Sequence, residues 1–159
     1  MKKFLLVIAL AAILATGTAF ADHPSGFGIG VQGGYGGGIG GALTLKFPSM
    51  PIFWAVDVGG AVNYLWLGLA GDYYFIDSAI AADIGLHWYL GVGGYVNLGV
   101  GDPLNVAVGA RVPIGLSWQP IPLLEIYLQI VPSVGLSVLP SVGLWPNFWS
   151  GNLGLRLWF

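Results

Sequence analysis

Charged and nucleophilic side chains are scarce in this chain, so the few that it carries limit its chemistry. Only 8% of the 159 residues are charged, against roughly 25% in a soluble domain. Ser117, His87 and Glu125 supply a nucleophile, a base and an acid, the three residue types of a hydrolytic site. A single histidine among polar residues is more often part of a hydrogen-bond network than a catalyst. We therefore expect no enzyme activity.

Metal and cofactor chemistry have little support in the sequence. The chain has no cysteine, and its two histidines, His23 and His87, lack the spacing of a metal site. The segment GIGVQG at 28–33 matches a dinucleotide-binding pattern. No helix signal follows it, so glycines within a strand explain the match better. We expect no metal and no cofactor.

The first 21 residues have the pattern of a cleaved secretory signal peptide. Two lysines precede an apolar run at 4–15, and small residues at 19 and 21 suit the signal peptidase. Residues 1–21 are thus predicted to be removed, and residues 22–159 to form one domain. Without the two leader lysines, three basic residues stand against seven acidic ones, which argues against nucleic acid as a partner.

Apolar residues recur at every second position through the mature chain, the period of a strand with two unlike faces. Clusters of glycine, proline and aspartate separate these segments. The pattern predicts eight strands, at about residues 26–36, 38–47, 52–61, 64–75, 84–99, 104–118, 122–133 and 150–159. The segment 76–83 is predicted to be a polar connection.

The two predicted strand faces indicate a membrane barrel. One face is aliphatic or aromatic, whereas the other mixes glycine with small polar, aromatic and charged residues. Closure satisfies every backbone hydrogen bond in lipid, and the apolar face then points outward. Aromatic residues also gather at strand ends, as interfacial girdles do: Phe47, Phe53, Trp54, Tyr73, Phe75, Trp118, Trp145 and Trp149. The predicted fold is all-β, a transmembrane antiparallel up-and-down β-barrel of eight strands; a soluble glycine-rich β-protein is the alternative.

The last segment, GNLGLRLWF, resembles the C-terminal signature of bacterial outer-membrane barrels. ALTLKF and ARVPIGLSW are further strand-like blocks. In pattern the mature chain resembles the OmpX, OmpW and OmpA-barrel kind, and uncharacterised small outer-membrane barrels with similar last strands. The resemblance implies an outer-membrane location, a lipid bilayer as partner, and recognition by the barrel assembly machinery. The residues implied to carry that signal are Leu153, Leu155, Leu157 and Phe159, although Leu157 stands where Tyr or Phe is common.

Most charged residues of the predicted strands fall on the inward face: Lys46, Asp57, Asp72, His87, Arg111, Glu125 and Arg156. A charge facing lipid near mid-bilayer would cost roughly 2–4 kcal/mol, so energetics alone predicts this placement. Arg111 and Glu125 are expected on neighbouring strands, where they could pair, and Arg156 could reach Glu125 from its other side. We expect ion pairs and inward rings to plug the lumen. A narrow path for small solutes is the alternative.

Two further interpretations concern binding. Inward glycines near the first strands could leave a cavity for a small hydrophobic ligand. The connection at 133–149 is predicted to be the one long outer connection, apolar and uncharged. It could extend the strands, fold over the mouth or lie in the interface, and a surface partner could bind there. The function expected is therefore an integral outer-membrane barrel with a structural role. Solute transport and surface binding through the 133–149 loop are the alternatives.

Overall fold

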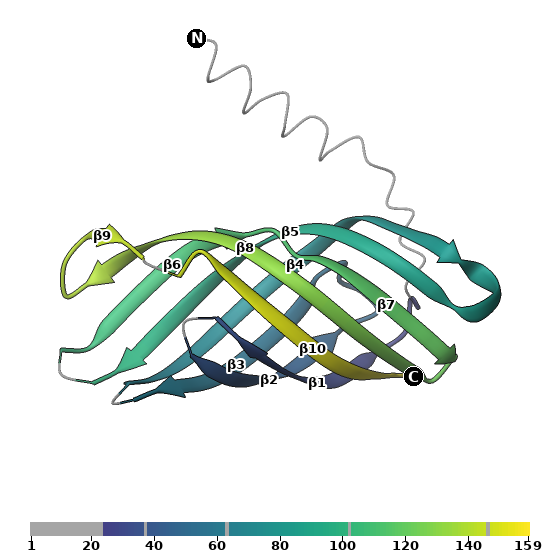
Figure 1. Ribbon diagram of the computed structural model, residues 1–159, viewed down its shortest axis with the longest axis horizontal. Coiled ribbons are helices and arrows are strands. Elements are labelled where there is room, and N and C mark those ends of the chain that lie inside the picture. Colours follow the sequence, from purple (N-terminus) through teal and green to yellow (C-terminus); the bar gives the residue numbers. More distant parts are fainter. Residues whose placement is uncertain (1–23, 37, 63, 102, 146) are drawn as a thin grey trace, which may run out of the picture.

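Strands make up most of the computed structural model (Figure 1), which describes residues 24–36, 38–62, 64–101, 103–145 and 147–159. The predicted signal peptide lies outside these residues. The strands are β1 (Gly28–Tyr35), β2 (Ile39–Lys46), β3 (Phe53–Ala61), β4 (Tyr64–Ala81), β5 (Leu86–Val100), β6 (Asn105–Arg111), β7 (Ile114–Ile121), β8 (Leu124–Leu139), β9 (Gly143–Leu144) and β10 (Trp149–Trp158). A 3-10 turn, η1 (Ala82–Ile84), joins β4 to β5. Within the described ranges, no helix is long and apolar enough to cross a membrane.

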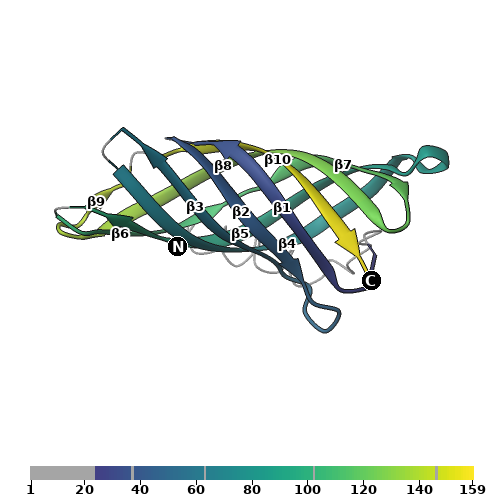
Figure 2. The same ribbon diagram turned by 90° about the horizontal axis from the view of Figure 1, so that it is seen from below.

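The strands close into one antiparallel ring with eight positions. β1 to β5 pair in chain order, β6 and β7 share the sixth position, β8 follows, and β10 closes on β1. The closing pair runs from Gly28 opposite Trp158 to Tyr35 opposite Gly151. The short β9 pairs with β8. Figures 1 and 2 show the strands inclined around a cylinder. The predicted eight-stranded antiparallel barrel is confirmed.

The two ends of the barrel differ, and we call them the terminal end and the loop end. At the terminal end β1 begins and β10 ends, and the backbone N–H of Phe27 donates to the carbonyl of Phe159 at 2.9 Å, with the reverse bond at 2.8 Å. The loop end carries the connections β1–β2, β3–β4, β5–β6 and β8–β10. The β4–β5 hairpin projects beyond the terminal end, and β8 with β9 projects at the loop end (Figure 1).

Strands continue into two predicted connections, so the polar connection predicted at 76–83 is wrong, and of the arrangements left open for 133–149 the structure has extended strands. β4 runs to Ala81, so the segment 76–83 is mainly strand and only η1 turns the chain. β8 runs to Leu139, and β9 lies farther along. The predicted loop at 133–149 is therefore largely part of the barrel wall. Backbone pairing with the neighbouring strand satisfies polar groups that a loop would leave to water.

A proline interrupts the strand predicted at 104–118. Pro113 has no N–H to donate to a ladder, and it separates β6 from β7. The ring stays closed there, because the Pro113 carbonyl accepts a hydrogen bond from the Gly91 N–H at 2.8 Å. The N–H of Val112 donates to the carbonyl of Pro132 at 2.9 Å. Side chains of the two short strands therefore continue one alternation between the inner and outer faces.

A bulge in β4 changes which side chains point inward. Tyr74 and Ile76 pair with consecutive residues of β5, so Phe75 is one residue too many for a regular ladder. A bulge of this kind shifts the alternation by one position. Asp77 therefore faces the interior, where it is only 4% exposed.

The inner and outer faces differ as the alternating sequence predicts. On β8, Glu125 is 0% and Gln129 3% exposed, whereas Leu128 is 55% and Ile130 58% exposed. Within the closed ring each strand position pairs with a neighbour on both sides, as hydrocarbon surroundings require. The core of this protein is thus polar and aromatic, and its surface is aliphatic.

Candidate functional site in the barrel interior

Glu125 is the centre of a hydrogen-bond network at the terminal end. Its Oε2 accepts hydrogen bonds from Nη1 of Arg156 at 2.8 Å and from Nε1 of Trp158 at 2.9 Å. Its Oε1 accepts one from Oγ of Ser117 at 2.8 Å. All four side chains are at most 4% exposed. Charge-assisted hydrogen bonds are strongest in such dry surroundings, so this carboxylate joins β7, β8 and β10.

Stacked aromatic rings fill the interior beside Glu125. The ring centroids of Phe53 and Tyr74 are 4.3 Å apart, and those of Tyr74 and Tyr89 are 4.5 Å apart. The guanidinium carbon of Arg156 lies 4.7 Å from the Phe53 centroid and 4.8 Å from the Tyr127 centroid. A cation held between ring faces is stabilised without water. We call the following eight side chains the plug: Phe53, Tyr74, Tyr89, Ser117, Glu125, Tyr127, Arg156 and Trp158.

Glycines on the inner face leave the space that two of these rings occupy. A β-carbon at Gly115 would overlap the ring of Tyr89, and one at Gly154 would overlap the ring of Tyr127. The hydroxyl of Tyr89 donates to the amide oxygen of Gln129 at 3.0 Å, and the hydroxyl of Tyr127 donates to the amide oxygen of Gln32 at 2.9 Å. The rings and the glycines are therefore a complementary set.

A second ion pair lies nearer the loop end. Nε of Arg111 is 3.0 Å from Oδ1 of Asp72. Both residues lie opposite Gly93 in the sheet, one on each side, so the pair bridges a position without a side chain. The expected pair between Arg111 and Glu125 is wrong. The ladder places Arg111 opposite Ser133 of β8, several positions from Glu125.

Lys46 and His87 of the predicted network contact other groups. Nζ of Lys46 donates to the carbonyl of Phe47 at 2.8 Å and lies 5.7 Å from the Phe53 ring. Nδ1 of His87 is 3.8 Å from Oδ1 of Asp77. Sequence reasoning missed Asp77, because it assigned residues 76–83 to a polar connection. In the structure this residue lies in β4, where the bulge turns it inward.

The side chains of the conceivable hydrolytic site are close in the sheet but are arranged differently. Ser117 lies directly opposite His87 in the β5–β7 ladder. Its hydroxyl nevertheless donates to Glu125, and that carboxylate already pairs with Arg156. A nucleophilic serine needs its proton directed at a free base. The observed geometry instead directs it to a carboxylate that is part of an ion pair.

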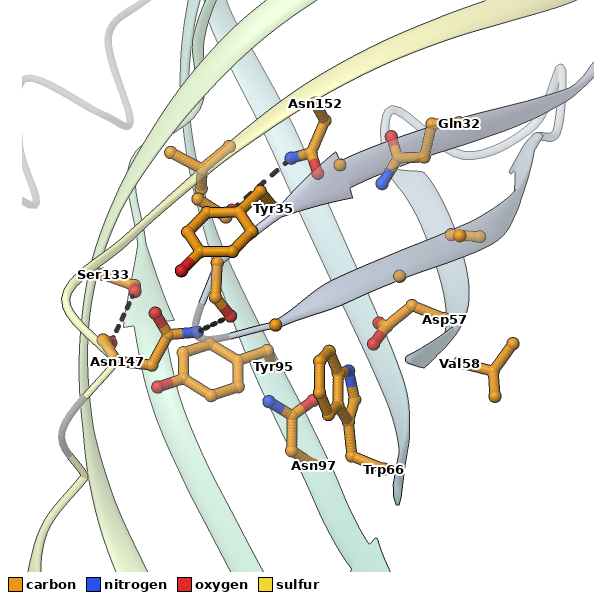
Figure 3. A pocket seen from close by; sticks show the side chains of 18 of the residues that line it. Gln32, Tyr35, Asp57, Val58, Trp66, Tyr95, Asn97, Ser133, Asn147 and Asn152 are labelled. Carbon is orange, nitrogen blue, oxygen red and sulfur yellow. Dashed lines mark hydrogen bonds between the residues drawn. The ribbon is translucent and has the colours of Figure 1, made fainter. Parts of the chain in front are cut away.

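A polar pocket with a volume of about 100 Å³ occupies the interior at the loop end (Figure 3). We call it the mouth pocket. Side chains from around the ring line it: Gln32, Asp57, Trp66, Tyr95, Asn97, Arg111, Ser133, Asn147 and Asn152. Gly34, Gly36, Gly38 and Gly40 line it too, as expected for a cavity near the first strands. Charged and amide side chains lie beside aromatic and aliphatic ones in its walls, which disfavours the small, purely hydrophobic ligand considered for a cavity there.

The mouth pocket contains residues that the sequence analysis did not single out as a site. Gln32, Asn97 and Asn152 stand at inward-facing positions of their strands, as do the interior residues that the sequence analysis named. The period-two pattern could have identified them as interior residues. Their gathering at one level depends on strand register, which the alternation alone does not fix.

The last strand presents its apolar residues to the outside. Leu153, Leu155, Leu157 and Phe159 are 59%, 48%, 41% and 70% exposed. Arg156 lies between two of them in sequence and is 3% exposed on the inner face. The single charge of this strand is thus removed from the apolar surface.

No protein family and no curated protein matches the chain by sequence. Two solved structures have a similar fold. The N-terminal β-barrel domain of Pseudomonas aeruginosa OprF matches with a TM-score of 0.55 and 16% identity over 85% of this chain and 98% of that domain. Neisserial surface protein A, NspA, matches with a TM-score of 0.52 and 17% identity over 84% of this chain and 97% of its own. The chain therefore has the fold of the small outer-membrane β-barrels.

Proposed function

We propose that the chain is an integral outer-membrane protein that acts as a closed structural barrel, without a catalytic site or an open pore. The plug carries this proposal. An eight-stranded barrel has an interior just wide enough for side chains to fill. Here Glu125 is 0%, Tyr89 1% and Tyr127 2% exposed, so water is excluded at this level of the lumen.

The outer-membrane location is part of the proposal. The aliphatic outer face, the closed ring and the fold shared with OprF and NspA support it. Residues 1–21 would direct export and be removed. Both termini would then face the periplasm, with the plug in the periplasmic half and the mouth pocket near the outer surface. The outward residues of β10 would present the signal to the barrel assembly machinery.

Conductance across a planar bilayer tests the closed lumen. The mature chain is refolded, and a heat-dependent shift in gel mobility verifies the barrel. We expect no steady openings from the native sequence. The double variant Tyr74→Ala with Tyr89→Ala removes two stacked rings and should conduct, because these rings fill the interior between Phe53 and Gln129.

A matched control removes two rings outside the plug. Tyr35→Ala with Tyr73→Ala deletes the same number of atoms and should remain silent. Steady openings from the native barrel would favour the alternative, a narrow channel for small solutes. Silence from the Tyr74→Ala, Tyr89→Ala barrel would show that these rings are not what closes the lumen.

A further inference from the structure

The mouth pocket gathers oxygen acceptors at one point. Asp57 and Asn97 lie on either side of Gly68 in the sheet, as its direct neighbours on β3 and β5. The point where a Gly68 β-carbon would sit is 2.5 Å from Oδ2 of Asp57 and 2.5 Å from Oδ1 of Asn97. Two side chains from different strands therefore direct oxygen atoms over the same glycine.

Asp57 brings a formal negative charge to this point. The other ionic groups of the pocket region, Arg111 and Asp72, pair with each other at 3.0 Å. Arg111 also attracts Asp57, and the indole N–H of Trp66 donates a hydrogen bond to it. Within the described residues, however, no ion pair of 4 Å or less joins Asp57 to a basic side chain. Lys46 and Arg156 belong to the terminal end, where they contact Phe53. The charge at the loop end thus favours a cation.

Aromatic rings form the adjoining wall of the pocket. The indole of Trp66 lies beside the Asp57 carboxylate (Figure 3), and Tyr95 contributes a second ring to the lining of the pocket. Ring faces attract organic cations, and indole does so best. A divalent metal ion suits this wall poorly, since calcium takes six to eight oxygen ligands. No group of three His, Asp or Glu side chains in the described ranges is placed to hold a metal.

We propose that the mouth pocket binds a small organic cation with N–H donors, of the ammonium or guanidinium type. Asp57 pairs with the charge, Asn97 accepts a second hydrogen bond, and Trp66 contacts the face of the cation. A volume of about 100 Å³ accommodates a head group of a few heavy atoms, since a water molecule takes about 30 Å³ in the liquid. The plug lies beyond the pocket, so the cation binds without crossing the barrel.

Methylguanidinium is the probe for this site, with methylurea as an uncharged molecule of similar shape. Each is titrated into the refolded barrel in detergent micelles, and the indole N–H resonance of Trp66 is followed by NMR. Trp66→Phe assigns the resonance. We expect a saturable shift with methylguanidinium and none with methylurea. Equal responses to both would overturn the proposal, as would the absence of saturation with methylguanidinium.

Two variants distinguish the effect of the Asp57 carboxylate on binding from the effect of the overall charge of the barrel. Asp57→Asn should weaken binding about tenfold, because a hydrogen bond to a charged group contributes roughly a factor of ten or more. Asp83→Asn removes an exposed carboxylate at the other end of the barrel and should bind like the native chain. Equal affinity in the two variants would contradict a role for Asp57. Gly68→Ala, which places a methyl group where the two oxygens converge, should abolish binding while the barrel still shows heat-dependent mobility.

Discussion

Arg156 of β10 and Glu125 of β8 are direct cross-strand partners, with Nη1 and Oε2 2.8 Å apart and both side chains almost fully buried. Each would be costly to bury alone, because an unpaired charge in a dry interior loses its hydration. The indole N–H of Trp158 and the hydroxyl of Ser117 donate two further hydrogen bonds to the carboxylate. The pair is therefore stable as a unit.

Replacing one member of this pair should cost more than replacing both. Glu125→Leu leaves Arg156 buried without its carboxylate and should lower the free energy of unfolding by about 3–5 kcal/mol. Glu125→Leu with Arg156→Met removes both charges and should recover most of that loss. Guanidinium titration of the refolded barrel, followed by tryptophan fluorescence, measures the difference. A double variant as unstable as Glu125→Leu would argue against mutual compensation.

The inner glycines should not tolerate a methyl group where a plug ring lies against them. Gly115→Ala and Gly154→Ala place a β-carbon into the rings of Tyr89 and Tyr127 and should each destabilise the barrel by about 1–3 kcal/mol. Gly143→Ala is the matched control, because its β-carbon would meet no atom within 4 Å. Its unfolding free energy should change by less than about 0.5 kcal/mol. Equal effects at all three glycines would point to strand propensity and not to ring packing.

Deleting the bulge residue should be tolerated, whereas deleting a regular strand residue should not. Without Phe75, the ladder joins Tyr74 directly to Ile76 and keeps Asp77 inward. Deleting Leu69 instead reverses the faces of the residues beyond it, which exposes Asp72 on the outer face. The fraction of chain with heat-dependent mobility after refolding compares the two. Failure of both deletions would mean that the bulge itself is required.

A charge on the outer wall tests whether that wall contacts lipid. Leu128 is 55% exposed and lies opposite Leu153 at the middle of the β8–β10 ladder. Replacing it with arginine should lower the folding free energy of the barrel in lipid vesicles by about 2–4 kcal/mol. Val142→Arg lies in the β8–β9 connection, where the residue is 80% exposed, and should cost less than about 0.5 kcal/mol. Similar small effects at both sites would be expected of a soluble barrel and would contradict the membrane assignment.

The alternation of apolar residues was sufficient to predict the barrel and most of its inner face. It identified Glu125 and Arg156 as interior residues and anticipated their contact, because cross-strand neighbours follow from strand order. It did not predict the partner of Arg111. That partner, Asp72, depends on how the registers of β4, β5 and β6 place both residues beside Gly93.

The alternation of apolar residues also did not predict where strands end or where a bulge occurs. Asp77 and Asp83 made the segment 76–83 look like a polar connection, yet pairing with β5 keeps most of it in β4. Phe75 adds a residue that no local signal marks. A mixed polar pocket such as that around Asp57 is harder still to predict, because six or more strands contribute to it and each must be in register.

The plug also constrains the order in which this protein folds. Its side chains come from β3, β4, β5, β7, β8 and β10, and the ring closes by pairing the first strand with the last. Such contacts are far apart in sequence and form slowly, after the entropy of a long loop has been lost. An open sheet would present Glu125 and Arg156 to water and would gain little from them. The contacts of Arg156 and Trp158 with Phe53 join strands on the two sides of the closing β1–β10 pair. Packing between these two parts of the plug is therefore coupled to closure of the ring.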